Sequence, residues 1–224
     1  MKIFLFAITG LLFWLLLTSN VGRSEDKNLK EKCNNSEDIF EQHVLDIYTK
    51  CNLKVKLDYT VFNQAMLGYN SLNLTNQNVL TIIDFSKPST EKRLFIIDVE
   101  KRNLLYQTFV AHGKNSGVNF ATQFSNRSGS LKSSFGFYRT AETYNGKHGY
   151  SLILDGMEKG INDNARKRAI VVHGAKYVSD EFIIKYNRLG RSWGCPAVSD
   201  KLSKEIIDMI KGGSFLFIHA NSKN

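Results

Sequence analysis

Cysteine and proline are scarce in this sequence, which has three cysteines and two prolines among its 224 residues. Three cysteines are too few for a fold held together by a disulfide framework. The 42% hydrophobic and 12% aromatic residues, with so little proline, exclude disordered and collagen-like chains. The composition is therefore that of a globular protein, and the length suits one domain with a small addition.

Long hydrophobic runs are absent except at the N-terminus. Lys2 is followed by an apolar run over residues 3–17 and then by small and polar residues up to Gly22. This order is typical of a secretory signal, although the run is also long enough to suggest an uncleaved anchor. We therefore expect residues 1–24 to be a signal peptide or N-terminal anchor. The protein would be exported to the periplasm or cell envelope, touching the membrane only through that segment if it is not cleaved.

The sequence also lacks a long block of basic residues, although 30 Lys and Arg against 21 Asp and Glu give a formal charge of +9. Removing residues 1–24 takes away two basic residues and no acidic one, which leaves +7. The densest cluster, residues 166–168, is only three residues long, and such short clusters usually lie on a solvated face. We expect no nucleic-acid partner.

The segment after the apolar run has helical character. Residues 25–35 are polar, and Ser36 is a suitable N-cap for a helix whose apolar residues, Phe40 and Val44 among them, repeat at helical spacing. Residues 58–67 predict a second helix. Cys33 and Cys51 bracket the first helix, and they either form a disulfide or remain free thiols. We expect residues 25–57 to form a helical N-terminal extension.

From residue 79 onward the pattern changes to short apolar runs rich in β-branched and aromatic residues, which predict strands. A helix is expected over residues 199–211, where apolar residues share one face and two glycines follow. The sequence thus predicts a mainly β domain with a few packed helices over residues 58–224. The strands are expected at residues 79–84, 93–99, 104–111, 150–154, 169–173 and 214–219.

Reactive residues concentrate at residues 190–197, Gly-Arg-Ser-Trp-Gly-Cys-Pro-Ala. A nucleophilic thiolate needs a neighbouring base, an accessible position and backbone amides aimed at the oxyanion that forms when a carbonyl is attacked. Gly194 leaves room beside Cys195, and the amides of both residues are candidate donors. The alternative for Cys195 is a buried structural thiol, but the polar, glycine-rich surroundings favour a loop.

A candidate base, His173, ends a predicted strand about twenty residues before the cysteine and is followed by Gly174. A histidine in such a place can meet a thiol in space. The alternative is a histidine that only hydrogen-bonds to its surroundings.

The run from His173-Gly174 to Cys195-Pro196 resembles the His-Gly and Ser-x-Gly-Cys signature of the L,D-transpeptidase catalytic domain family, in the branch with Gly-Arg-Ser-x-Gly-Cys-Pro-Ala. The similarity covers roughly residues 58–198. Other stretches that fit the same branch are residues 111–117, 124–126, 133–138, 144–149 and 162–165.

The resemblance implies a β-sandwich or β-barrel catalytic domain that acts on peptidoglycan stem peptides without a metal or organic cofactor. Cys195 would attack the carbonyl of the third stem residue, expel the terminal D-alanine and form a thioester. His173 would serve as general base, held in orientation by a backbone carbonyl near Gly174. Attack by a second amine would give L,D-transpeptidase cross-links, and attack by water would give L,D-carboxypeptidase trimming.

Several residues near the cysteine are candidates for holding the loop or contacting the substrate. Ser192 is expected to orient the cysteine loop, and Trp193 stands where many family members have histidine. Arg191 is a candidate contact for a substrate carboxylate, the alternative being a solvated loop charge. His112 is either a second imidazole near the site or a strand-end histidine bonded to backbone.

Two other classes of function remain open. A zinc-dependent wall peptidase would use His112, His148, His173 and Cys195 as ligands, although no short metal-binding spacing such as His-Glu-x-x-His is present. A non-catalytic module that binds the cell wall would keep the basic surface without the chemistry.

Overall fold

The computed structural model describes residues 37–221. Residues 1–24, the polar segment 25–35, Ser36 and Cys33 lie outside the described residues, so the expectations about them stay predictions. Two compact units divide the chain at residues 46 and 47, and residues 37–50 form the first described helix. Cys51 is a buried free thiol. Within residues 37–221, no helix combines the length and apolar character that crossing a bilayer requires.

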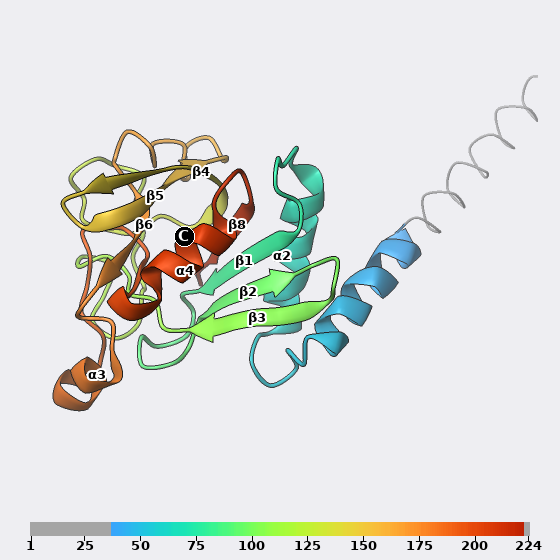
Figure 1. Cartoon of the computed structure of the whole chain (residues 1–224), viewed down its shortest axis with the longest axis horizontal. Helices are drawn as coiled ribbons and strands as arrows, with labels where there is room; N and C mark the ends of the chain where they lie inside the picture. Colours follow the sequence, from blue (N-terminus) through green and yellow to red (C-terminus); the bar gives the residue numbers. More distant parts are fainter. Residues whose placement is uncertain (1–36, 222–224) are drawn as a thin grey trace, which may run out of the picture. The chain divides into compact units, whose positions relative to one another are not determined.

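The second unit is built on one mixed sheet of eight strands, in the order β3-β2-β1-β8-β4-β5-β6-β7 (Figure 1). The pairs β1–β8 and β6–β7 are parallel, and the other neighbours are antiparallel. The strands are β1 (Val79–Asp84), β2 (Leu94–Asp98), β3 (Asn103–Thr108), β4 (Gly136–Gly146), β5 (Gly149–Gly156), β6 (Val171–Ala175), β7 (Ala197–Ser199) and β8 (Phe215–His219).

The two edges of this sheet approach each other through the segment that follows β3. The Ala111 amide donates to the Ala197 carbonyl at 2.8 Å, and the Ala197 amide donates back to the Ala111 carbonyl at 3.3 Å. Backbone that has just left one edge strand thereby pairs with β7 at the other edge. The sheet is nearly a barrel, which confirms the expected mainly β fold with a few helices.

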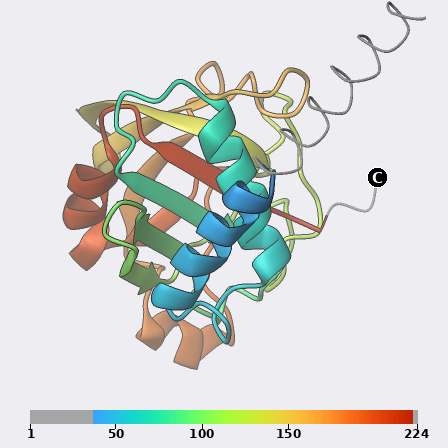
Figure 2. The same ribbon diagram turned by 90° about the vertical axis from the view of Figure 1, so that its right-hand side faces the viewer.

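Helices α2 (Tyr59–Ser71) and α4 (Asp200–Ile210) cover opposite faces of the sheet (Figures 1 and 2). Leu216 belongs to the main apolar core together with Ile206 and Ile207 of α4. The ring of its neighbour Phe215 makes an edge contact with Tyr69 of α2. Successive side chains of a strand point to opposite faces, so the two helices sandwich β8.

The expected helices and six expected strands are present, with small shifts of their ends. Strands β4 and β7 and helix α3 (Asp180–Tyr186) were not predicted. No residue of α3 is buried, so it has no apolar face to repeat at helical spacing. The predicted strand 104–111 ends at residue 108, because the chain there turns away from β2 toward β7.

Candidate active site

Cys195 and His173 come from neighbouring segments of the sheet. In the parallel pair β6–β7, His173 is opposite Ala197, so Cys195, two residues earlier, runs alongside Val171. His173 and Val171 are two residues apart in one strand and therefore face the same side of the sheet. Cys195 and His173 thus lie on neighbouring segments, two residues apart along the direction of the strands.

The His173 imidazole is held by the next residue in the chain. Its Nδ1 lies 2.8 Å from the Gly174 carbonyl oxygen, which assigns the proton to Nδ1 and leaves the Nε2 lone pair free. Burial lowers the pKa of His173, and the positive charge of His148 lowers it further, while the Gly174 carbonyl and Asp200 oppose both effects. His173 is therefore a neutral base at neutral pH.

Cys195 is half-buried, and its thiol donates a hydrogen bond to the Ala169 carbonyl at 3.6 Å. Within the described residues the thiol and the His173 imidazole share no hydrogen bond. Burial raises the pKa of Cys195, and a hydrogen bond from the Val171 amide and the positive charge of Arg168 oppose that rise. The Cys195 side chain is therefore a thiol rather than a thiolate at neutral pH.

The cysteine loop is folded on Ser192. The Ser192 hydroxyl donates to the Cys195 carbonyl at 2.6 Å and accepts from the Gly194 amide at 3.1 Å. The expectation that the Gly194 amide is free to bind an oxyanion is therefore wrong, because that amide is used inside the loop. The Cys195 amide makes no hydrogen bond among the described residues and remains the candidate oxyanion donor.

Gly194 is required by its surroundings. Its φ of +128° is a conformation that residues with a side chain rarely adopt, and a Cβ there would lie 2.8 Å from the Lys132 carbonyl. The Ser133 hydroxyl donates to the Gly194 carbonyl at 3.1 Å. Residues 132 and 133 thus pack directly against the cysteine loop.

Arg168 is the residue of this site that sequence reasoning missed. It was grouped with the charged cluster 166–168 as part of a solvated face, yet its guanidinium donates to the Ser125 carbonyl at 2.6 Å and to the Lys132 carbonyl at 2.5 Å. Its partners come from a loop some forty residues away, so no local pattern marks it. Arg166 and Lys167 are exposed as expected, and Arg166 pairs with Glu142 at 2.6 Å.

Two residues of the loop face solvent or backbone. The Trp193 side chain is 73% exposed, and the Lys147 ammonium lies 5.9 Å from its ring centre. The Arg191 guanidinium donates to the carbonyls of Lys114 and Gly117 at 3.2 and 3.1 Å. Trp193 is thus an open surface beside the cysteine, and Arg191 joins the loop to the segment after β3.

His112 is fully buried and both of its ring nitrogens are engaged. The Arg93 guanidinium lies 2.8 Å from Nδ1, and Nε2 lies 3.3 Å from the Gly117 carbonyl. Burial, with the charge of Arg93, lowers the pKa of His112 to about 3. Of the two readings of His112, the structure favours the strand-end histidine that holds backbone.

A hollow of about 440 Å³ lies beside two residues whose backbone contacts the Cys195 thiol. It is lined by Ala169 and Val171, which also contact the thiol, and by Tyr144, Ile153 and Arg166. Apolar side chains form most of its wall. Cys195 itself is not one of its lining residues.

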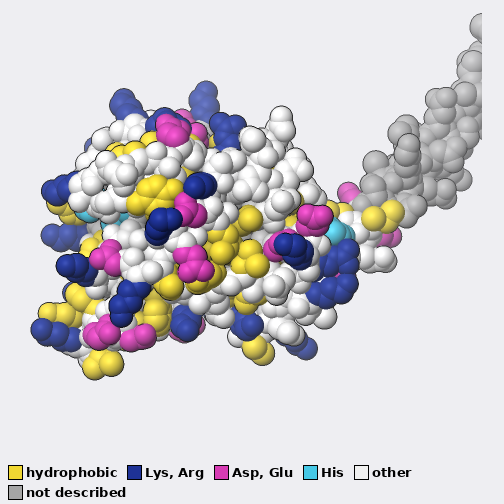
Figure 3. Space-filling view, viewed as in Figure 1, with side chains coloured by type: hydrophobic (Ala, Val, Ile, Leu, Met, Phe, Trp, Pro, Cys, Tyr) yellow, Lys and Arg dark blue, Asp and Glu magenta, His cyan; other side chains and the backbone are white. Residues whose placement is uncertain are grey.

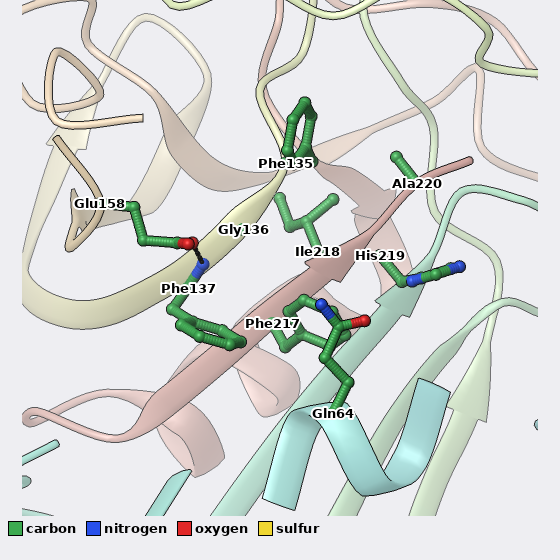
Figure 4. Close-up of a pocket in the computed structure, with 9 residues that line it drawn as sticks. All are labelled: Gln64, Phe135, Gly136, Phe137, Glu158, Phe217, Ile218, His219 and Ala220. Carbon is green, nitrogen blue, oxygen red and sulfur yellow. Dashed lines mark hydrogen bonds between the residues drawn. The ribbon is translucent and has the colours of Figure 1, made fainter. Parts of the chain in front are cut away.

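A second hollow, of about 470 Å³, lies between α2, the start of β4 and the end of β8 (Figure 4). One of its walls is Glu158, whose carboxylate accepts a hydrogen bond from the Phe137 amide at 2.5 Å. None of the candidate site residues lines it.

The surface charges are dispersed. On the face shown in Figure 3, Lys and Arg side chains stand singly or in small groups and alternate with Asp and Glu. Among residues 37–221, no three His, Cys, Asp or Glu side chains are grouped so that they could hold a metal ion. His112, one of the four ligands that a zinc site would need, has both nitrogens occupied.

Comparison with known proteins gives one family and a set of solved structures. A family model described as L,D-transpeptidase catalytic domain matches residues 53–219. An L,D-transpeptidase from Mycobacterium smegmatis is 12% identical with a TM-score of 0.39, and the match covers 64% of this chain and 59% of that one. The helical cell shape determining protein Pgp2 from Campylobacter jejuni is 14% identical with a TM-score of 0.43, over 70% of this chain and 55% of that one.

The chain thus spans little more than half the length of these two structures. Comparison with curated proteins gives no match.

Proposed function

This chain belongs to the L,D-transpeptidase catalytic domain family, and from that premise we propose that it is a cysteine acyltransferase acting on peptidoglycan stem peptides. The observation that carries the proposal is the relation of His173 to Cys195. A neutral imidazole with a free Nε2 stands on the strand beside the segment that presents a thiol with an unbonded amide.

In the proposed reaction, the Cys195 sulfur attacks the carbonyl carbon of the third stem residue. His173 Nε2 takes the thiol proton as the carbon–sulfur bond forms. The tetrahedral intermediate then breaks its carbon–nitrogen bond, and the imidazolium gives its proton to the departing amine of D-alanine. The product is a thioester on Cys195.

The same two groups complete the cycle. The amine of a second stem attacks the thioester, His173 accepts its proton, and the sulfur leaves and recovers a proton as a new amide bond forms. Water attacking in place of the amine would give trimming of the stem, which is the L,D-carboxypeptidase reaction. We propose cross-linking and trimming as alternative outcomes of one acyl-enzyme.

Because the resting thiol donates to Ala169, the first step requires it to turn toward His173. Turning would replace the long hydrogen bond of 3.6 Å to Ala169 by an interaction with a neutral base. Burial favours the uncharged pair until the substrate arrives, so proton transfer would accompany attack rather than precede it.

We propose that the Cys195 amide binds the oxyanion and that Ser192 holds the loop so that this amide points outward. The apolar hollow beside Ala169 and Val171 would receive part of the donor stem. Trp193 would form an exposed wall, and the Arg191 guanidinium would reach a substrate carboxylate while remaining bonded to backbone.

We extend the proposal to the organisation of the chain. Residues 1–24 would be a signal peptide or anchor that directs the protein to the cell envelope, residues 25–57 a helical extension, and residues 58–224 the catalytic domain. These assignments rest on the sequence pattern and on where the substrate occurs.

The test uses the purified chain, defined muropeptides and mass spectrometry. Wild type should release D-alanine from tetrapeptide stems and yield dimers or trimmed stems, whereas Cys195→Ser should yield neither. A carbapenem should add its mass to wild type and not to Cys195→Ser. Activity that persists in Cys195→Ser, or is lost only on treatment with a chelator, would contradict the thiol mechanism and favour a zinc peptidase.

A further inference from the structure

The turn between β4 and β5 lies against both halves of the proposed catalytic pair. Gly146 and Gly149 are opposite each other, which leaves Lys147 and His148 as the turn residues. Gly149 has a φ of +73°, while the two residues before it are outside the left-handed region, as in a type I turn followed by a glycine bulge. This conformation fixes the direction in which His148 leaves the turn.

His148 stacks on the proposed general base. The two imidazole rings have centroids 4.5 Å apart and planes inclined by 27°. His148 is exposed, whereas His173 is only 3% exposed, so His148 forms the solvent side of the stack. The neighbouring Lys147 extends over the Trp193 ring at 5.9 Å and gives the turn a second contact, on the cysteine loop.

We propose that His148 is a positioning residue that keeps the His173 imidazole neutral and fixes its plane. The inference rests on the proposed role of His173 as general base. His148 would act through His173 and would not itself exchange a proton with the substrate. It assigns a function to a histidine outside the His-Gly and Ser-x-Gly-Cys signature.

The physical reason is the separation of the two rings. Two positive charges this close repel each other by several times the thermal energy, so the pair holds one proton more readily than two. The exposed ring of the pair is His148 and the buried ring is His173, and burial disfavours the charged form of His173. Among the described residues, the titratable groups close to His173 are His148, Asp200 at the start of α4 and Cys195 on the neighbouring segment. Asp200 has the opposite effect to His148 on the pKa of His173.

Stacking also restricts the ring. The hydrogen bond from Nδ1 to Gly174 fixes one point of the imidazole, and the parallel face of His148 fixes its tilt. Together they determine where Nε2 points, which is the geometry that a base must keep while it receives the thiol proton.

The test is an NMR titration of the histidine side chains in the full chain. The His173 signal is identified by its loss in His173→Gln, and its pKa is measured in wild type, His148→Gln and His148→Phe. Both His148 variants remove the charge, so the pKa of His173 should rise by about one unit in each. The acid limb of kcat/KM should move to higher pH by the same amount, since more alkaline solution is then needed to keep His173 neutral.

The two variants separate charge from stacking. Phenylalanine keeps a flat ring, so kcat on the plateau of the pH profile should be close to that of wild type, while glutamine should lower it. Lys147→Gln is the matched control, because it removes a charge from the same turn without touching the stack, and it should leave the His173 titration unchanged.

An unchanged His173 titration in both His148 variants would overturn the inference, and so would an equal shift in Lys147→Gln. The outcome is independent of the proposed function. A wild-type protein that releases no D-alanine, but whose His173 titration moves as expected, would contradict the transpeptidase proposal and still support the electrostatic coupling of the two rings.

Discussion

At the scale of single residues, the positive charge that acts on Cys195 comes from Arg168. Its guanidinium opposes the rise in the pKa of Cys195 that burial causes, and it binds the carbonyls of Ser125 and Lys132 behind the cysteine loop. From its sequence neighbours alone, Arg168 would be placed on the surface. It instead supplies a positive charge near Cys195 and holds the backbone behind the cysteine loop.

Replacing Arg168 by glutamine should make the thiol less acidic. Loss of the positive charge disfavours the thiolate, so the pKa of Cys195 should rise by about one unit, and alkylation near pH 7.5 should slow by up to about tenfold. The rate of iodoacetamide addition across pH, followed by intact mass, measures the change. Arg168→Lys keeps the charge without the forked hydrogen bonds and should be intermediate.

Lys167→Gln is the control for this measurement, because it removes one positive charge at the adjacent, exposed position in the sequence. Cys195→Ser identifies the adduct that belongs to the nucleophile. Equal alkylation profiles for Arg168→Gln and Lys167→Gln would show that the guanidinium has no special influence on the thiol.

Gly194→Ala should destabilise the fold more than Gly129→Ala. Both glycines have positive φ, but a Cβ at Gly194 would meet the Lys132 carbonyl at 2.8 Å, whereas nothing lies within 4 Å of one at Gly129. Strain alone costs about 1 kcal/mol, and the collision adds to it, so we expect about 2–4 kcal/mol at Gly194. Urea unfolding of the two variants gives the difference, and equal midpoints would contradict it.

At the scale of elements, a buried polar cluster ties the segment after β3 to the start of β2. Arg93 donates to the Val110 carbonyl at 3.0 Å and contacts His112, whose far nitrogen meets Gly117. The cluster holds residues 110–117 in place, and the cysteine loop in turn rests on that segment through Arg191. His112 contributes to the site by supporting backbone.

This cluster predicts sensitivity to acid. The folded pKa of His112 is about 3, below the value of about 6.5 for an unfolded chain. The unfolded state therefore binds a proton that the folded state rejects, and the free energy of unfolding should fall as pH drops from about 6.5 toward 3. Between pH 6.5 and 4.5 this residue should account for about 2–3 kcal/mol.

His112→Gln provides the comparison, because an amide can accept from Arg93 and donate to Gly117 without titrating. Urea unfolding at pH 7.0 and 4.5 should give a smaller pH dependence for the variant than for wild type. If both proteins lose the same stability on acidification, the neutral buried imidazole is not its source.

The strands that the sequence predicted most clearly are those that are buried along their whole length. β1 and β2 are buried along their whole length, so each appears as a continuous apolar run. β4 is half-exposed, with a register shift after Thr140, and its polar and aromatic residues do not alternate cleanly. β7 has three residues and is defined by its partners, β6 and Ala111, which no local pattern reveals.

The same contrast applies within the site. The sequence motif pointed to Cys195, His173 and Ser192, whose proposed roles are those of a nucleophile, its base and the hydroxyl that holds the loop. Arg168 was not predictable, since its contacts depend on a loop that folds back from residues 125–134. His148 was named only as a possible zinc ligand, because its stacking on His173 depends on the turn between β4 and β5. Tertiary packing, rather than residue type, gives both their contacts.

At the scale of the whole molecule, the formal charge of +9 and its dispersed distribution predict adhesion to an anionic wall polymer that is separate from catalysis. Cys195→Ala should bind isolated sacculi as wild type does, with both released by rising salt, while D-alanine release is lost. Sedimentation with sacculi measures binding, and mass spectrometry measures turnover. If Cys195→Ala still released D-alanine, the cysteine would not be needed for turnover. Wall binding would then be the only property left to assign to this region.

The pairing of Ala111 with Ala197 also bears on self-association. A sheet edge normally exposes a row of unpaired amides and carbonyls to which a strand from another copy can add, and such growth leads to aggregates. Here the outer side of β7 already carries backbone from the chain itself, directly beyond the reactive cysteine. This bridge leaves less of the edge of β7 as a template for a strand of a second copy, so we expect the protein not to associate through this edge.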